Sequence, residues 1–77
     1  MTKIIPIHHR RLSCIFEKDG FLHSRTAGDH DVYTKTGCIR PLIIPRYRAV
    51  PVFIIKNLMR TSGMSRERYF ELLVECS

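Results

Sequence analysis

The chain has 77 residues, 44% of them apolar, which fits one small globular domain spanning residues 1–77 and excludes a disordered chain. Its 13 Lys and Arg residues against 7 Asp and Glu residues leave a formal net charge of +6, which predicts a polyanionic partner, either nucleic acid or an acidic protein. No apolar run approaches the ~18 residues of a membrane span and the N-terminus lacks a signal-peptide core, so we expect a cytoplasmic protein with no membrane partner.

The first element predicted along the chain is a helix over residues 8–19. Its apolar face carries three residues at the i, i+3, i+4 spacing of a buried helical stripe, namely Leu12, Ile15 and Phe16. Gly20 follows directly, and glycine is the residue best suited to the left-handed position after a helix end. The helix is therefore amphipathic and needs a second layer to cover its apolar face.

Three strands are predicted next. Residues 21–27 alternate loosely between apolar and polar, and residues 30–35 contain the β-formers of the second strand. Gly28-Asp29 between them is suited to a tight turn, and Thr36-Gly37 forms a second turn before a third strand over residues 38–44. The three strands should form an antiparallel meander in chain order.

Proline and glycine mark the ends of the remaining elements. Pro41 has no N–H to donate, so the strand that contains it must lie at an edge of the sheet. Pro51 suits the first turn of a helix that Gly63 ends, and Ser65 suits the cap of a short last helix. The residues expected to be buried in these two helices are Ile55, Leu58, Met59, Tyr69, Phe70 and Leu73. The order αβββα with a short extra C-terminal helix predicts an α+β fold with the helices on one face of the sheet.

Cysteines and histidines give no sign of a metal site. Cys14, Cys38 and Cys76 form no CxxC pair and are odd in number, so we expect buried small side chains and neither a disulfide framework nor a zinc site. His8 and His9 are adjacent, and neighbouring residues on a helix point about 100° apart, which disfavours chelation of one ion. We expect no metal and no other cofactor.

Several motifs occur together between Arg11 and Leu73. They are EKDGF at 17–21, Gly-x-His-x-x-Tyr at 28–33, RPLIIPR at 40–46 and LMRTSGMSRERYFELL at 58–73. In this combination the chain resembles the HicA toxin family, also called YcfA-like. The resemblance implies a double-stranded-RNA-binding-domain-like fold, the toxin role in a type II toxin–antitoxin system of the stress response, and a HicB-like antitoxin as partner. It also implies metal-independent endonuclease cleavage of mRNA, with His30 as the catalytic residue.

The chemistry of RNA cleavage fits such a site. RNA carries its own nucleophile, the 2′-OH, so the enzyme needs proton transfer and cations on the phosphate. Histidine as a residue type can exchange a proton near neutral pH, so His30 suits the role of general acid or base. The side chains expected to contact phosphate groups are Arg25, Lys35, Arg40 and Arg46. Arg48 is a further candidate for binding RNA. Tyr47 lies between Arg46 and Arg48 and is a candidate for stacking on an unpaired base, whereas Tyr33 is expected to pack in the sheet.

Three residues depart from the family pattern and keep other functions open. Asp29 stands where relatives usually have serine, Tyr47 where many have histidine, and Phe53 where glycine is common. Asp29 and Asp31 put carboxylates on both sides of His30 in the sequence, which would repel phosphate. The alternatives are a catalytically degenerate RNA-binding module and a basic protein-interaction module of the same fold.

Overall fold

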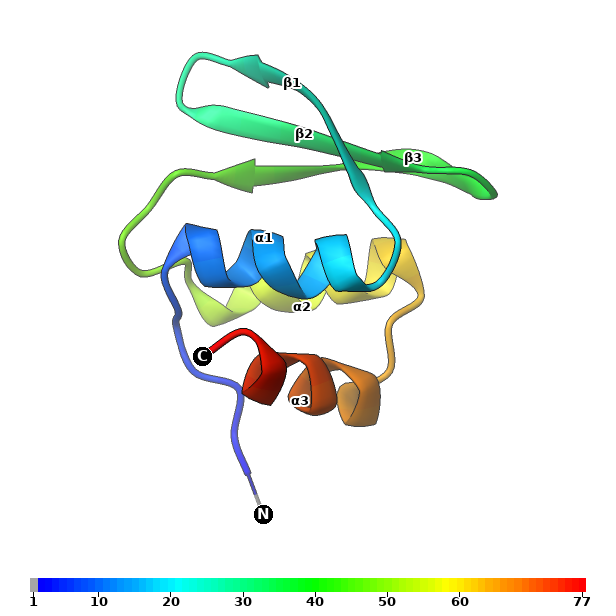
Figure 1. Cartoon of the computed structure of the whole chain (residues 1–77). Coiled ribbons are helices and arrows are strands. Elements are labelled where there is room, and N and C mark those ends of the chain that lie inside the picture. The colour runs from blue at the N-terminus through cyan, green and yellow to red at the C-terminus, as the bar shows by residue number, and fades with distance from the viewer. Residues whose placement is uncertain (1) are drawn as a thin grey trace.

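The computed structural model describes residues 2–77 and confirms the predicted order of elements (Figure 1). Every predicted boundary of the strands and of the first helix lies within one residue of the observed one. The elements are α1 (His9–Lys18), β1 (Leu22–Ala27), β2 (His30–Lys35), β3 (Cys38–Pro45), α2 (Val52–Ser62) and α3 (Arg66–Glu75). Within the described residues, no helix combines the length and the apolar character that crossing a membrane requires.

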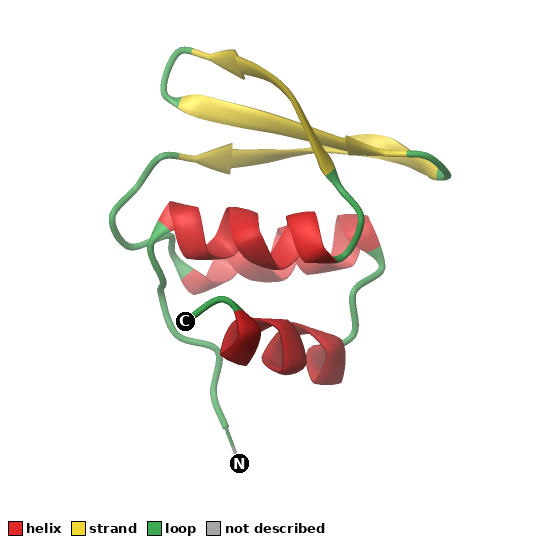
Figure 2. Ribbon diagram, viewed as in Figure 1, coloured by secondary structure: helices red, strands yellow, loops and turns green. Residues whose placement is uncertain are grey.

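The sheet and the helices form layers. The strands pair antiparallel in the order β1-β2-β3, so β3 is an edge strand and Pro41 lies at the edge as predicted. All three helices lie on the same side of the sheet, with α1 and α2 next to it and α3 beyond them (Figure 2). The other face of the sheet is not covered by any helix of the described chain.

Alternation along β2 assigns its side chains to two faces. Tyr33 pairs with Leu42, and both belong to the hydrophobic core beneath the sheet. Asp31 is two residues from Tyr33, so it shares this covered face, whereas His30 and Val32 point to the other one. The expectation that two carboxylates flank His30 is therefore wrong, because Asp31 lies on the opposite face of the sheet.

The apolar residues predicted to be buried are buried in α1 and α2, but only in part in α3. The residues predicted to be buried in α1 are fully buried, and those predicted in α2 are at most 8% exposed. In α3 the two most buried side chains are Tyr69 and Leu72, while Phe70 and Leu73 are only partly buried. The face of α3 that contacts the core is thus narrower than predicted, because this helix packs on the other helices and does not reach the sheet.

One expectation about the cysteines is wrong, because the structure joins Cys14 to Cys76 in a disulfide bond. The two Cα atoms lie 5.9 Å apart, within the usual range for a disulfide. The packing of α1 against α3 brings them together, and Arg11 in the same interface donates from Nη2 to the Leu73 carbonyl (2.8 Å). Because the two cysteines are 62 positions apart, no local spacing in the sequence signals this pairing. Cys38 is free and half-buried.

Candidate functional site

A two-residue turn positions His30 at the start of β2. Ala27 pairs with His30, so Gly28 and Asp29 form the whole connection, and Gly28 adopts a φ of +62° that favours glycine. The His30 side chain is 42% exposed, and its Nδ1 lies 3.0 Å from Oδ1 of Asp29. When Nδ1 donates a proton to this carboxylate, Nε2 carries the lone pair that can accept a proton.

His30 lines a groove of about 360 Å³ between the uncovered face of the sheet, its β3 edge and α2, which we term the His30 groove. The side chains that line it are His30, Pro41, Ile43, Pro45, Tyr47, Ile54, Asn57, Leu58 and Thr61. Tyr47 is 44% exposed, and its backbone is held in place because its carbonyl accepts a hydrogen bond from the His9 N–H (3.1 Å). The structure thus brings together His30 and Tyr47, the predicted catalytic and stacking residues.

The basic residues predicted to bind phosphate are not all near His30. Arg25 pairs with Val32 across β1 and β2, so it is exposed on the same face of the sheet as His30. Arg48 is exposed in the loop that follows Tyr47. Of the predicted cations, Arg25 thus shares a face of the sheet with His30, and Arg48 is adjacent to Tyr47 of the groove.

Lys35 and Arg40 lie toward the other end of the sheet. Lys35 is five residues from His30 along β2, about 16 Å at the rise of a strand. Its Nζ lies 3.7 Å from a carboxylate oxygen of Asp19 and 5.4 Å from the centroid of the Phe21 ring. Arg40 lines a depression beside the end of α2. Any phosphate contact that these residues make is therefore to a part of the RNA distant from His30.

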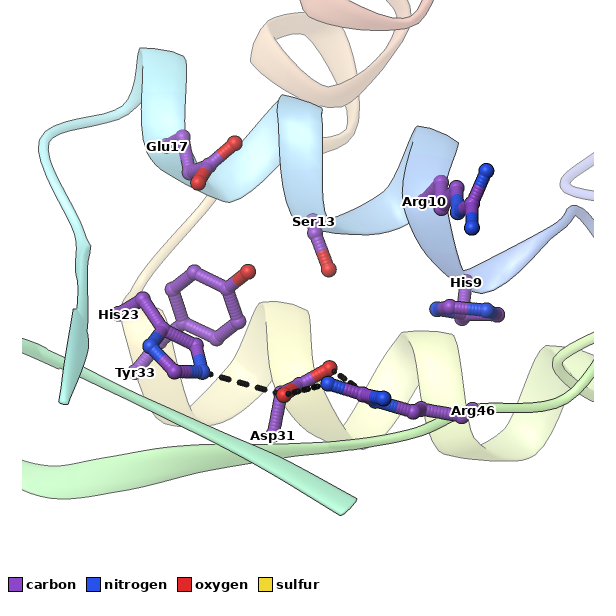
Figure 3. A pocket seen from close by; sticks show the side chains of 8 residues that line it. All are labelled: His9, Arg10, Ser13, Glu17, His23, Asp31, Tyr33 and Arg46. Atoms are coloured by element: carbon purple, nitrogen blue, oxygen red, sulfur yellow. Dashed lines mark hydrogen bonds and ion pairs between the residues drawn. The ribbon is translucent and has the colours of Figure 1, made fainter. Parts of the chain in front are cut away.

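Arg46 belongs to a second, more polar site on the covered face of the sheet (Figure 3). This pocket of about 400 Å³, which we term the polar pocket, opens between α1 and the strands. Every side chain that lines it carries a polar group: His9, Arg10, Ser13, Glu17, His23, Asp31, Tyr33 and Arg46. These side chains come from α1, β1, β2 and the residue after β3, over residues 9–46, so no single local motif predicts this pocket.

Asp31 organises the polar pocket. Its Oδ2 accepts a hydrogen bond from Arg46 Nε (2.9 Å), and its Oδ1 accepts from Arg46 Nη2 (2.9 Å) and from the Thr26 hydroxyl (2.8 Å). His23 Nε2 also lies 3.1 Å from Oδ1. The hydrogen bonds from Arg46 hold the pKa of the Asp31 carboxyl well below its usual range, although burial of the side chain, which is 8% exposed, opposes them.

Two other groups of the pocket have shifted pKa values. Burial lowers the pKa of His9, and the nearby charges of His8, Arg10 and Arg46 lower it further, so this imidazole is neutral at pH 7. Burial also raises the pKa of the Tyr33 phenol, which therefore stays protonated. In the sequence, the alternation of side chains along β2 is the signal that places Asp31 on the same face as Tyr33.

The Asp31–Arg46 pair predicts a specific dependence of stability on pH. The pKa of Asp31 is lower in the folded chain than in the unfolded one, so its contribution is complete above about pH 4 and is lost as the pH falls below that value. At pH 7 we expect Asp31→Asn to lower the free energy of unfolding by about 1–3 kcal/mol, because the amide leaves the guanidinium without its counter-charge. Urea denaturation from pH 7 to pH 2 measures both effects.

Asp29→Asn is the matched control, because the Asp29 side chain is 79% exposed. This control should leave the free energy of unfolding nearly unchanged at every pH. The Asp31→Asn variant should lose less stability than the wild type on acidification. If the free energy of unfolding falls by the same amount between pH 7 and pH 2 in the wild type and in Asp31→Asn, the role assigned to Asp31 is wrong.

Comparison of the chain with protein-family models and with curated proteins finds no match. The resemblance to the HicA family therefore rests on the motifs quoted above. What the chain does has to be argued from the residues and geometry of the two sites.

Proposed function

We propose that this protein is a metal-independent endoribonuclease, the toxin of a HicA-like toxin–antitoxin pair, with His30 as its proton-transfer group. The observation that carries the proposal is the position of His30 in the groove. Its ring is half-exposed, is paired through Nδ1 with Asp29, and shares the groove with the exposed Tyr47. We expect the protein to act on mRNA in the cytoplasm.

The reaction needs no cofactor. Nε2 of His30 removes the proton of a ribose 2′-OH, and the resulting oxygen attacks the adjacent phosphorus. The P–O5′ bond breaks and the leaving 5′ oxygen takes a proton from water, so the products are a 2′,3′-cyclic phosphate and a 5′-OH. Asp29 holds the imidazole in the tautomer that leaves Nε2 free. Arg25, on the same face of the sheet, would offset the negative charge that develops on the phosphate.

Tyr47 would hold the RNA in place for this step. An exposed aromatic ring beside the acid–base group supports an unpaired base, and stacking of this kind tolerates any sequence. Arg48 follows it and would contact the backbone of the same strand. Single-stranded RNA is therefore the expected substrate, because its bases are free to leave the helical stack.

An antitoxin of the HicB kind would silence the toxin by covering the His30 groove. The groove is lined by apolar side chains, of which Ile43 is 51% exposed. The chain as a whole has a net charge of +6. A partner with an apolar segment flanked by acidic residues would match both features. In such a complex His30 is expected to be shielded from solvent.

Asp29 favours a second candidate, a non-catalytic RNA-binding module. Its carboxylate is 79% exposed beside His30, where it repels a phosphate. Such a module would bind RNA with a strong dependence on salt and would leave it intact. A basic protein-interaction module is the third candidate, favoured by the apolar lining of the groove.

A cleavage assay separates these candidates. The purified protein is incubated in EDTA with a mixed-sequence RNA and with the DNA of the same sequence, and a gel shift is recorded at several salt concentrations. The ribonuclease should cut the RNA to products with 2′,3′-cyclic phosphate ends and leave the DNA intact, because DNA lacks the nucleophile. Intact RNA together with a salt-sensitive gel shift would replace the enzyme with the binding module, and no shift would favour the protein-interaction module.

A further inference from the structure

The polar pocket divides into two ends of different chemistry. Figure 3 shows His9, Arg10 and Arg46 gathered at one end, and Glu17, His23 and Tyr33 at the other. The ribonuclease step proposed for His30 uses none of these residues. The pocket is thus an unassigned site with its own charge pattern.

The first end is a cationic one. Arg10 is exposed at the start of α1, and Arg46 is 47% exposed although two of its nitrogens are bonded to Asp31. Figure 3 shows Arg10, His9 and Arg46 on the same side of the pocket, which all three line. Neutral His9 keeps one N–H donor and one acceptor. This end offers charge and hydrogen bonds to a phosphate.

The second end is aromatic and accepts hydrogen bonds. The rings of His23 and Tyr33 meet edge to face with centroids 5.4 Å apart, and Asp31 fixes the orientation of His23 through Nε2. Glu17 lies on the same side, near enough for its charge to raise the pKa of Tyr33. A ligand with a planar ring and an amine suits this end of the pocket. The rings of His23 and Tyr33 would pack on the ligand ring, and the carboxylate of Glu17 would accept a hydrogen bond from the amine.

We propose that the polar pocket binds a single nucleotide, with its phosphate at Arg10 and a base bearing an exocyclic amine at Glu17. The volume of about 400 Å³ lies in the range of small-molecule sites. This inference rests on the proposed function, since the nucleotide would belong to the RNA substrate. It makes the polar pocket a specificity subsite next to the His30 groove, because Arg46 of the one site is followed directly by Tyr47 of the other.

A simple anion fits the pocket less well than a nucleotide does. Asp31 already pairs with Arg46, and Glu17 adds a second negative charge, so the pocket has no large excess of positive charge. A ligand with a negatively charged end and a hydrogen-bond-donating end would match both the cationic end of the pocket and the carboxylate of Glu17. Inorganic phosphate should therefore bind more weakly than a nucleotide.

The test is a titration of the ¹⁵N-labelled protein, followed by NMR, with CMP, UMP and inorganic phosphate. CMP and UMP are a matched pair, because an exocyclic amine in the one replaces a carbonyl oxygen in the other. CMP should shift the signals of His9, His23 and Tyr33 and should bind several-fold more tightly than UMP. Arg10→Ala should weaken binding of both nucleotides about tenfold, since it removes a charged partner of the phosphate.

Glu17→Gln should leave CMP bound but abolish the preference over UMP, because an amide can turn to donate or accept. Arg10 and Glu17 are both exposed, so these variants should keep the wild-type fold. The inference is overturned if no ligand binds at about 10 mM, if phosphate binds as tightly as CMP, or if the shifts appear only at His30 and Tyr47. Cleavage of RNA without CMP binding would refute this subsite alone, whereas CMP binding in the pocket without RNA cleavage would refute only the ribonuclease.

Discussion

Replacing His30 by alanine is expected to lower the rate of RNA cleavage by about 10²- to 10⁴-fold, the usual contribution of a positioned acid–base group. In the proposed mechanism the imidazole of His30 accepts the proton, and this exposed side chain contributes little to the core. The variant should therefore keep the stability and the RNA affinity of the wild type. Cleavage is measured from the appearance of 2′,3′-cyclic phosphate ends, and affinity by gel shift.

Lys56→Ala is the matched control, since Lys56 is exposed on α2 and does not line the groove. This variant should cleave RNA at the wild-type rate. Asp29→Asn should cleave RNA at a rate between those of Lys56→Ala and His30→Ala. The substitution weakens the hydrogen bond that selects the tautomer of His30 but leaves the imidazole in place. If His30→Ala cleaves as fast as Lys56→Ala, then His30 is not the proton-transfer group and the proposed mechanism is wrong.

Reduction of the Cys14–Cys76 disulfide is expected to lower the free energy of unfolding by about 4 kcal/mol. The cross-link closes a loop of 62 residues, nearly the whole chain, and so restricts the unfolded state strongly. This is a large fraction of the stability of a domain of this size. Urea denaturation of the wild type with and without a thiol reductant measures the difference.

Two serine variants test the assignment. Cys76→Ser should be as unstable as the reduced wild type, and the reductant should not change it further. Cys38→Ser should respond to the reductant as the wild type does, because Cys38 is the free thiol. Equal denaturation midpoints for oxidised and reduced wild-type protein would show that the cross-link does not form in solution. In a reducing compartment the cross-link would be disfavoured, and the packing of Tyr69 and Leu72 would still hold α3.

The two sites meet at the end of the sheet where β3 leads into the loop before α2. Arg46 points to the covered face and its neighbour Tyr47 lines the groove on the other side. The Arg46–Asp31 pair and the hydrogen bond from the His9 N–H to Tyr47 fix this loop. RNA bound across the loop would contact the acid–base group on one side and the proposed subsite on the other.

The sequence by itself determined the order of elements, both hairpin turns, the edge position of Pro41 and the position of His30 at the start of the second strand. Each of these depends on hydrogen bonds and side-chain periodicity within a few residues, which a local pattern expresses. Only the tertiary structure decided the disulfide, the groove between His30 and α2, and the polar pocket around Asp31. Those features depend on which segments pack together, because contacts between residues distant in sequence form only when α1, the sheet and α3 bury a common core.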